Sequence, residues 1–383
     1  MINKIKIIAD DKIPFLKGVF EPFTKIEYFP GSKISRENLI DADALIVRTR
    51  TKCNKDLLSG TRVKLISTAT IGYDHIDTNY CKKNNIIWLN APGCNSSSVM
   101  QYITSALLTI AKKEKFNSSE KTIGIVGAGN VGSKIKNVAK YLGMKILLND
   151  PPRERIEGSD NFCSIDEIKN EADIITFHIP LNNDGIDKTF HLADEEFFSQ
   201  LKKKPIIINS SRGEVIKTSA LKNAIKNEKV RNVILDVWEN EPNIDLELLE
   251  IVDIATPHIA GYSADGKANG TSVCVNAINE FFNLGMTKNW YPENIPDANN
   301  GNEIEMDCLN KSDQEIFTEI VEHTYSIMED DERLRKSVST FEKQRGDYPI
   351  RREFINYYLK IENCNDSIKS NLSNFGFNII KNK

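Results

Sequence analysis

A glycine-rich loop between a strand-like run and a helix-like run constrains the fold of this chain more than any other feature. The loop reads Gly127-Ala128-Gly129-Asn130-Val131-Gly132. It follows the β-branched run 122–126 and precedes a stretch, 133–142, whose apolar residues recur at helical spacing. In such a unit the first glycine permits a tight turn, the second lets the backbone approach a pyrophosphate, and the third lets the helix pack closely on the strand. The sequence therefore predicts a dinucleotide-binding loop, with cofactor contacts from Gly127, Gly129, Asn130, Val131 and Gly132.

The residue that ends the next strand-like run indicates which dinucleotide binds. The run Lys145–Asn149 is followed by Asp150, eighteen residues past Gly132. A carboxylate at this place accepts hydrogen bonds from ribose hydroxyls and repels a 2′-phosphate, so we expect NAD as the cofactor, bound in part by Asp150. Arg153 and Arg155 follow closely and leave NADP open as an alternative.

Strand and helix patterns alternate along most of the chain, which is typical of parallel sheets covered on both faces. The expected strands of the first stretch are Ile5–Ala9, Lys25–Phe29, Ala44–Val47, Leu65–Ala69 and Ile86–Leu89. Those of the second are Lys121–Val126, Lys145–Asn149, Asp173–Phe177, Pro205–Asn209, Asn232–Val237 and Asp253–Ala255. Beyond residue 285, a Pro-, Asn- and Gly-rich stretch (289–302) reads as a linker, followed by one helical stretch (316–328) and a charged run (329–335).

Composition narrows the class of protein. A chain of 383 residues with a net charge of −4 has no overall basic field for nucleic acid or an anionic membrane. No apolar run approaches the roughly 20 residues of a membrane span. Seven cysteines, an odd and dispersed set without a C-x-x-C pair, favour reduced thiols over disulfides and give no metal-binding spacing. We therefore expect a cytoplasmic protein with no metal site, no nucleic-acid partner and no membrane partner.

Three chemically apt side chains follow three strands of the second stretch, where active sites of open sheets lie. Arg212 follows the strand at 205–209, and Glu241 and His258 follow the next two. A histidine suits removal of a hydroxyl proton near neutral pH, a glutamate fixes its tautomer, and an arginine binds a planar carboxylate through two N–H groups. Together with the dinucleotide loop, the set predicts hydride transfer from a 2-hydroxy acid.

At these residues the chain resembles the D-2-hydroxyacid dehydrogenase family. The matching segments are Gly127-x-Gly129-x-x-Gly132, Ser211-Arg212-Gly213, Asp236-Val237-Trp238-x-x-Glu241-Pro242 and Pro257-His258-Ile259-Ala260-Gly261. The resemblance implies a catalytic set of Arg212, Glu241 and His258, further cofactor contacts from Asp236 and Gly261, and an α/β architecture of two doubly wound parallel-sheet domains, one flavodoxin-like and one Rossmann-like. The expected domains are a substrate-binding domain (1–97 plus 262–285), an NAD-binding domain (98–261) and a smaller C-terminal α+β dimerisation domain (286–383).

Further segments are Val47-Arg48-Thr49, Ala91-Pro92-Gly93-Cys94-Asn95, Asp150-Pro151-Pro152-Arg153 and, near the C-terminus, Tyr348-x-x-Arg351-Arg352-Glu353. They resemble one branch of the family, which oxidises 4-phospho-D-erythronate in pyridoxal phosphate biosynthesis. By that resemblance the substrate contacts are Thr49, Thr70 and Tyr262, and the chain forms a homodimer through its C-terminal domain. A phosphorylated acid has an anionic group at each end, so with Arg212 at the carboxylate we expect Arg48, together with Thr49 and Thr70, at the phosphate. Arg48 is equally well read as a surface residue. One position departs from the family, since Ile179 stands where a cofactor-contacting threonine is usual.

Some alternatives stay open at this level. Arg351 and Arg352 read as a solvated charge pair, with a reach into a neighbouring subunit's site as the second reading. The substrate alternative is another D-2-hydroxy acid such as 3-phosphoglycerate. A non-catalytic NAD-sensing scaffold of the same fold is the alternative from a different class.

Overall fold

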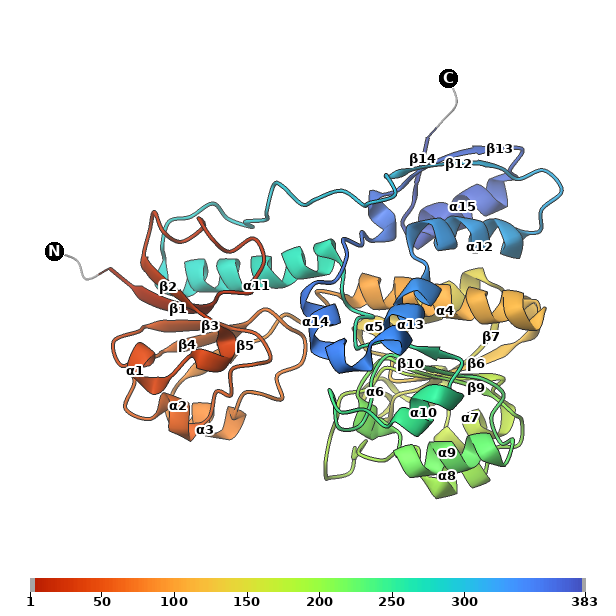
Figure 1. Ribbon diagram of the computed structural model, residues 1–383, viewed down its shortest axis with the longest axis horizontal. Coiled ribbons are helices and arrows are strands. Elements are labelled where there is room, and N and C mark those ends of the chain that lie inside the picture. The colour runs from red at the N-terminus through yellow and green to blue at the C-terminus, as the bar shows by residue number, and fades with distance from the viewer. Residues whose placement is uncertain (1–3, 381–383) are drawn as a thin grey trace. The chain divides into compact units, whose positions relative to one another are not determined.

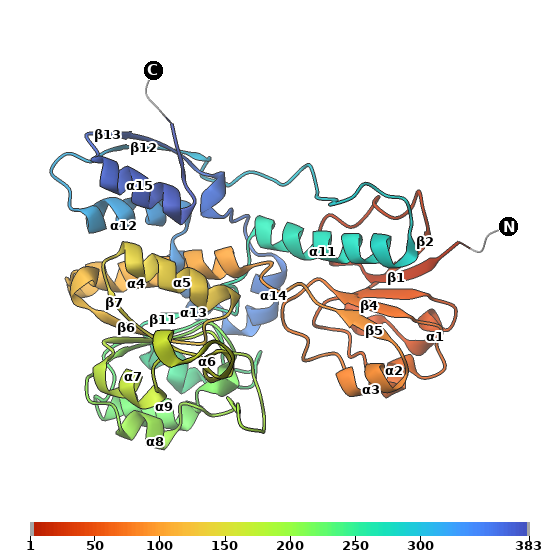
Figure 2. The same cartoon turned by 180° about the vertical axis from the view of Figure 1, so that it is seen from behind.

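The computed structural model describes residues 4–380 and divides the chain into two compact units. One unit comprises Met1–Asn95 and Ser263–Pro296, and the other comprises Ser96–Tyr262 and Asp297–Lys383. Figure 1 and Figure 2 show that each unit is built around its own parallel sheet. The outermost three residues at each end of the chain, which belong to the predicted first and third domains, lie outside the described residues.

The first unit is built on a five-stranded parallel sheet with the order β2-β1-β3-β4-β5. Its strands are β1 (Lys6–Asp10), β2 (Lys25–Phe29), β3 (Ala44–Val47), β4 (Leu65–Thr68) and β5 (Ile87–Leu89). Its helices are α1 (Arg36–Leu39), α2 (Lys55–Leu58), α3 (Thr78–Lys83) and α11 (Ala264–Phe282). This strand order is the flavodoxin-like one, so the predicted fold of this part is confirmed.

Both faces of that sheet are covered, which explains why its strands read as continuous apolar runs. On one face Ile8 and Leu45 lie in a core cluster with Leu57 of α2. On the other face Ile7 lies in a cluster with Val275 of α11, and Figure 2 shows this long helix on the opposite side of the sheet from α1 to α3. The chain segment after residue 262 thus returns to complete the first unit.

The second unit contains a six-stranded parallel sheet with the order β11-β10-β9-β8-β6-β7. Its strands are β6 (Thr122–Val126), β7 (Lys145–Asn149), β8 (Ile174–Phe177), β9 (Ile206–Asn209), β10 (Val233–Leu235) and β11 (Ile254–Ala255). The accompanying helices are α4 (Ser96–Glu114), α5 (Asn130–Tyr141), α6 (Pro151–Glu157), α7 (Ile165–Glu171), α8 (Glu195–Ser199), α9 (Thr218–Lys226) and α10 (Leu246–Ile251). Because β7 and β8 pair on opposite sides of β6, the strand order reverses there, which is where ligands of such sheets bind.

The C-terminal region adds a three-stranded parallel sheet to the second unit, with the order β12-β13-β14. Its strands are β12 (Glu303–Asp307), β13 (Tyr358–Glu362) and β14 (Asn378–Ile379). Its helices are α12 (Asp313–Thr324), α13 (Ile327–Lys336), α14 (Phe341–Gly346) and α15 (Asp366–Phe375).

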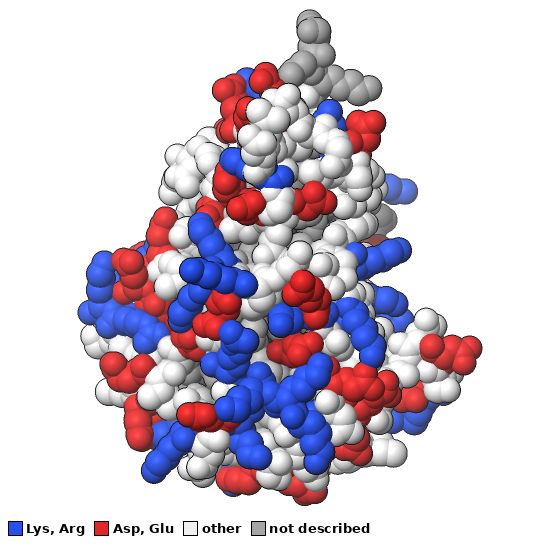
Figure 3. Space-filling view, turned by 90° about the vertical axis from the view of Figure 1, so that its right-hand side faces the viewer, with Lys and Arg blue, Asp and Glu red and all other residues white. Residues whose placement is uncertain are grey.

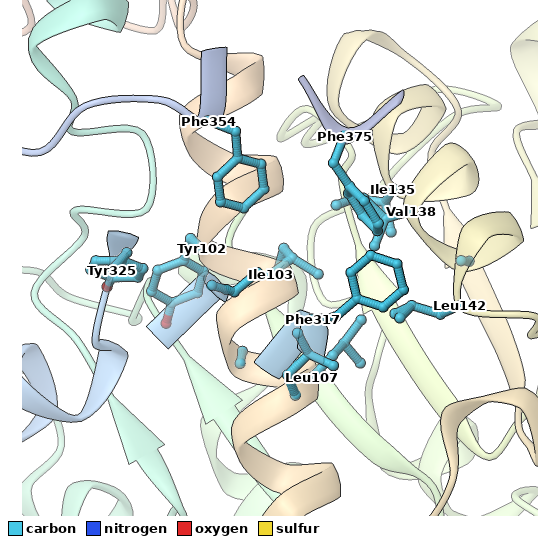
Figure 4. Packing of buried hydrophobic residues seen from close by; sticks show 14 of the residues in the cluster. Tyr102, Ile103, Leu107, Ile135, Val138, Leu142, Phe317, Tyr325, Phe354 and Phe375 are labelled. Carbon is cyan, nitrogen blue, oxygen red and sulfur yellow. The ribbon is translucent and has the colours of Figure 1, made fainter. Parts of the chain in front are cut away.

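One hydrophobic core joins the C-terminal region to the glycine-loop sheet. Ile103 and Leu107 of α4 and Ile135 of α5 lie in the same cluster as Phe317 of α12 and Phe375 of α15, as Figure 4 shows. The rings of the two phenylalanines are 5.1 Å apart between centroids. Each such side chain contributes about 1.5–3 kcal/mol when it is fully buried, so the C-terminal region is held firmly against α4 and α5.

The predicted single helix over 316–328 is wrong. The chain is extended at Tyr325, between α12 and α13, and the Tyr325 hydroxyl donates to Asp330 Oδ2 at 2.9 Å. The charged run that follows lies in α13, where several acidic groups have hydrogen-bond partners. Asp331, for example, accepts a hydrogen bond from the Ala255 backbone N–H at 2.7 Å.

The expectation that all cysteines are reduced is also wrong, because Cys308 and Cys364 form a disulfide. Cys308 follows β12 and Cys364 follows β13, and these two strands pair side by side in parallel. Their Cα atoms are 5.3 Å apart although 56 residues separate them in sequence. Spacing along the chain gave no sign of this pairing.

Charged side chains of both signs intermix on the face shown in Figure 3. Ion pairs such as Lys145–Glu171 and Arg231–Glu114 are found in the second unit. This face therefore presents no continuous field of one sign. Within residues 4–380, no helix is both long and apolar enough to cross a membrane.

Candidate active site

The glycine loop has the conformation that each of its glycines predicts. Gly127 has a φ of +95°, and a Cβ on Gly132 would lie 1.9 Å from the Gly127 carbonyl oxygen. A Cβ on Gly129, by contrast, would meet nothing within 4 Å. Gly127 and Gly132 are thus required by the backbone conformation and by close packing. Gly129 leaves open space beside the backbone at the start of α5. These features fit a pyrophosphate at the helix N-terminus.

Asp150 lies beside this loop and stabilises its shape. One carboxylate oxygen accepts from the Ala128 backbone N–H at 2.8 Å, and the other accepts from the Arg153 N–H at 3.1 Å as the N-cap of α6. Asp150 thus ties the end of β7 to the glycine loop, next to the open space at Gly129. This placement is compatible with the predicted ribose contact.

The residue that departs from the family pattern lies beneath the loop. Ile179 is partly buried and packs against the core on the α7–α10 side, and it would touch a Cβ on Gly127. Its neighbour His178 has its Nε2 2.9 Å from Thr176 Oγ1, and burial lowers the pKa of His178 to about 3. His178 is therefore neutral at physiological pH. Its backbone packs against the glycine loop, since a Cβ on Gly127 would lie 2.5 Å from the His178 carbonyl oxygen.

His258 and Glu241 come together as predicted. Nδ1 of His258 lies 2.7 Å from Oε2 of Glu241, and Oε1 of Glu241 accepts from the Trp238 backbone N–H at 2.9 Å. Burial opposes ionisation of Glu241, but the charge and hydrogen bond of His258, the Trp238 N–H and the charge of Arg345 hold its pKa below the ordinary value. An ionised carboxylate accepts the Nδ1 proton and so leaves Nε2 of the neutral imidazole able to take a proton.

Asp236 holds the loop that carries His258. Its buried carboxylate accepts from Thr256 Oγ1 at 2.6 Å and from the backbone N–H groups of Ile259 and Ala260 at 2.7 and 2.9 Å. Its backbone oxygen accepts from the His258 N–H at 2.7 Å. Burial raises the pKa of Asp236, and these donors together with His258 offset the effect only in part. The structure thus places Asp236 beneath the loop, and its predicted cofactor contact stays a prediction, as does that of Gly261 in the same loop.

Arg212 follows β9 and lies next to the segment that leads to Glu241. The Arg212 Nη1 donates to the Ser211 carbonyl oxygen at 2.8 Å. The Arg212 carbonyl oxygen accepts from Asn209 Nδ2 at 2.9 Å. A Cβ on Gly213 would lie 2.0 Å from the Trp238 carbonyl carbon, so only glycine lets these two loops approach so closely. Arg212, Glu241 and His258 therefore follow three successive strands of one sheet.

Three of the predicted substrate residues belong to the first unit. Arg48 and Thr49 follow β3, and Arg48 Nη1 donates to the Lys12 carbonyl at 3.2 Å. Thr70 follows β4 and donates to the Gly72 carbonyl at 2.9 Å. All three lie at carboxyl ends of parallel strands, where a ligand of this sheet would bind.

The fourth substrate residue, Tyr262, belongs to the second unit and lies among residues of the C-terminal region. Its ring packs edge-on against that of Tyr348 with centroids 5.9 Å apart. The guanidinium carbon of Arg345, from α14, lies 5.7 Å from the centre of the Tyr262 ring. Arg345 also stabilises the Glu241 carboxylate, as described above. Sequence reasoning missed Arg345, because it lies in a region without a motif and 83 residues beyond Tyr262.

The reading of Arg351 and Arg352 as a solvated charge pair is wrong. Their exposed fractions are only 4% and 7%. Arg352 Nη2 donates to Asn356 Oδ1 at 2.6 Å, whereas Arg351 turns toward the His258 loop of its own chain. Burial among partners from the same chain explains both positions. Among residues 4–380 no three His, Cys, Asp or Glu side chains gather as a metal site would require.

Comparisons with known proteins show the family to which the chain is similar. Residues 105–260 match the family described as D-isomer specific 2-hydroxyacid dehydrogenase, NAD binding domain. Residues 299–376 match a domain of unknown function.

Three curated relatives bear the name erythronate-4-phosphate dehydrogenase. That of Bacteroides thetaiotaomicron is 52% identical over 91% of this chain and 97% of its own length. That of Porphyromonas gingivalis is 41% identical over 91% of this chain and 94% of its own. That of Escherichia fergusonii is 40% identical over 98% of this chain and 99% of its own length.

Solved structures with NAD bound share the fold. A D-lactate dehydrogenase from Aquifex aeolicus, complexed with NAD and lactic acid, has a TM-score of 0.60 and 27% identity over 72% of this chain and 95% of that chain. A 3-phosphoglycerate dehydrogenase from Entamoeba histolytica with bound NAD⁺ has a TM-score of 0.59 and 25% identity over 76% and 99%.

Proposed function

Because this chain belongs to the D-isomer specific 2-hydroxyacid dehydrogenase family, within its erythronate-4-phosphate dehydrogenase branch, we propose that it oxidises 4-phospho-D-erythronate with NAD. The product is (R)-3-hydroxy-2-oxo-4-phosphobutanoate, and the reaction belongs to pyridoxal phosphate biosynthesis. The observation that carries the proposal is the pair of His258 and Glu241, 2.7 Å apart, on the sheet that also holds the glycine loop.

His258 is the acid–base residue of the proposed reaction. Its Nε2 accepts the proton of the C2 hydroxyl while the hydride leaves C2, so that a C=O bond replaces the C–H and O–H bonds. NAD, when bound at the glycine loop, supplies the acceptor for that hydride. Glu241 keeps the imidazole in the required tautomer and stabilises the imidazolium that results.

Arg212 binds the substrate carboxylate. A guanidinium offers two parallel N–H donors to a carboxylate, which fixes C2 relative to His258. The phosphate end requires donors elsewhere, and we assign it to Arg48, Thr49 and Thr70, with Tyr262 as a further substrate contact. Arg48 supplies the charge, and the two threonines supply hydroxyl donors.

Replacement of His258 tests the acid–base assignment. We expect His258→Ala to abolish NADH formation from 4-phospho-D-erythronate while the affinity for NAD changes by less than about threefold. His191→Ala is the matched control, because His191 also pairs with a glutamate, Glu239, at 2.7 Å but has no role in the proposal. Turnover that survives in His258→Ala would refute the assignment.

We further propose a cytoplasmic homodimer that associates through the C-terminal region. The location is supported by the need for NAD, which is an intracellular cofactor. Association is supported by apolar side chains that this region exposes, among them Leu309 and Ile355, which are 60% and 64% exposed. Light scattering at micromolar concentration is expected to give twice the chain mass, and the mass of one chain would contradict the dimer.

A further inference from the structure

We propose that Arg351, in the C-terminal region, is a positioning residue for His258. In this proposal Arg351 holds the carbonyl groups of Ile259 and Ala260, the two residues that follow His258, and thereby fixes the imidazole relative to the substrate. The inference rests on the proposed acid–base role of His258. It gives the matched domain of unknown function a part in the active site of its own chain.

The loop after His258 is gripped from two sides. Asp236 accepts the N–H groups of Ile259 and Ala260. Nη2 of Arg351 donates to the carbonyl oxygens of the same two residues, at 3.3 Å and 2.5 Å. The backbone N–H and C=O groups of both residues are therefore engaged, the N–H groups by Asp236 of the NAD-binding sheet and the C=O groups by Arg351 of the C-terminal region. The Ile259 carbonyl oxygen also accepts from the Tyr262 N–H at 2.8 Å, so Arg351 is the main donor only to Ala260.

The side chain of Arg351 is itself rigidly held. Its guanidinium carbon lies 4.5 Å from the centre of the Tyr325 ring and 5.8 Å from that of Tyr348. Both tyrosine hydroxyls donate to Asp330 Oδ2, at 2.9 and 2.6 Å. Figure 4 shows Tyr325 beside Tyr102 of α4, which anchors this group on the common core.

The hydrogen bonds of the buried Arg351 guanidinium go to the loop that follows His258. Within residues 4–380, Nε and Nη1 of Arg351 have no hydrogen-bond partner, so its hydrogen bonds go to the two carbonyls. A buried charged group without full pairing is costly, so the two carbonyl oxygens of the loop matter for the stability of this cation. The charges of Asp330 and Asp236 help to stabilise it.

The conformation of His258 explains why its loop needs such a grip. His258 has a φ of +57°, in the left-handed region that residues with a Cβ rarely adopt. A strained backbone of this kind persists only where its surroundings hold it from several sides. If the hydrogen bonds from Arg351 to the Ile259 and Ala260 carbonyls are lost, we expect the loop to relax. The Nε2 atom of His258 would then move away from the position that proton transfer requires.

A second arginine of the C-terminal region provides a matched control. Arg335, on α13, donates to the carbonyl oxygens of Leu249 and Val252 at 2.6 and 2.9 Å. It therefore uses the same chemistry to attach the C-terminal region to the NAD-binding sheet, but at the end of α10 and not at the His258 loop. If Arg351 serves only to attach the C-terminal region, Arg335→Met should have the same effects as Arg351→Met.

The test compares Arg351→Met, Arg351→Lys and Arg335→Met in the full chain. Hydrogen exchange resolved to single amides is expected to show Ile259 and Ala260 exchanging at least about tenfold faster in Arg351→Met, with Arg335→Met at the wild-type rate there. With 4-phospho-D-erythronate, kcat should fall at least about tenfold in Arg351→Met while KM for NAD changes by less than about threefold. Arg351→Lys retains the charge and one donor, so it should recover part of both losses.

Exchange at Ile259 and Ala260 that is unchanged in Arg351→Met, or equally accelerated in Arg335→Met, would overturn the inference. If Arg351→Met does not fold, Arg351→Lys carries the test, because wild-type exchange at these amides would again overturn it. Absence of turnover in the wild-type enzyme would instead overturn the proposed function, and the exchange comparison would still decide whether Arg351 holds the loop.

Discussion

Replacement of Glu241 by glutamine tests the central pair of the site with almost no change of shape. The glutamine oxygen can still accept from the Trp238 N–H, but its amide group then faces Nδ1 of His258 in place of the carboxylate. An amide N–H forces Nδ1 to act as the acceptor, so the proton of the neutral imidazole moves to Nε2. That tautomer cannot take the hydroxyl proton of the substrate.

The size of the effect follows from the geometry. At 2.7 Å, a carboxylate stabilises an imidazolium by about 6 kcal/mol at an effective dielectric constant of about 20. The side chains of His258 and Glu241 are 30% and 19% exposed, so water screens part of this energy. Since about 1.4 kcal/mol corresponds to a tenfold change in rate, we expect kcat to fall by roughly 10³- to 10⁴-fold.

The assay is steady-state formation of NADH from 4-phospho-D-erythronate, with thermal unfolding as a check of the fold. Glu239→Gln is the matched control, since Glu239 also meets a histidine at 2.7 Å, and it should keep kcat within about threefold of wild type. A loss in Glu241→Gln of less than about tenfold, or an equal loss in both variants, would refute the assignment of Glu241.

Three further predictions concern cofactor binding and pH. Gly129→Ala should fold like the wild type but bind NAD at least about tenfold more weakly, because its Cβ enters the open space that we assign to the pyrophosphate. Gly132→Ala should instead lower the unfolding free energy by about 1–3 kcal/mol, because its Cβ clashes with the Gly127 carbonyl. Thermal melts and NAD titrations separate the two effects, and equal melts would contradict the packing argument. Asp150→Asn removes the charge that repels a 2′-phosphate, so the ratio of kcat/KM for NADP to that for NAD should rise about tenfold, and an unchanged ratio would contradict the role of Asp150. In the folded protein the pKa of His178 is about 3, whereas that of an unfolded histidine is near 6.5. Between these values the unfolded state binds one more proton than the folded state. The unfolding free energy therefore falls by up to about 1.4 kcal/mol per pH unit as the pH drops below about 6.5. Urea unfolding between pH 7 and 5 should show a shallower dependence in His178→Gln, and the same slope as in the wild type would contradict burial of a neutral imidazole.

The sequence predicts the strands and the pairing of Glu241 with His258 well, because local patterns carry that information. The strands of the two large sheets lie within two residues of their predicted positions, because buried parallel strands are short apolar runs bounded by polar turns. The pairing of Glu241 with His258 was also predictable, since both follow neighbouring strands and the carboxyl ends of parallel strands meet at one edge.

The parts that failed depend on contacts between distant segments. The disulfide of Cys308 and Cys364 requires knowledge that β12 and β13 pair, which no periodicity reveals. The break at Tyr325 coincides with contacts that helical spacing does not reveal, since the Tyr325 hydroxyl donates to Asp330 and its backbone carbonyl accepts from Ser105 of α4. The same holds for Arg345 and Arg351, whose charges suggest solvent until the structure shows the partners that bury them.

The most direct test of the proposed function compares two substrates with the purified protein. NADH formation is measured with 4-phospho-D-erythronate and with 3-phospho-D-glycerate under the same conditions, and a 2-oxo acid acceptor is included in a second set to release any bound NADH. The proposal predicts that kcat/KM for the four-carbon acid is more than about tenfold higher, which corresponds to about 1.4 kcal/mol in transition-state binding. A preference for 3-phospho-D-glycerate, or no turnover of either acid by protein that binds NAD, would contradict it.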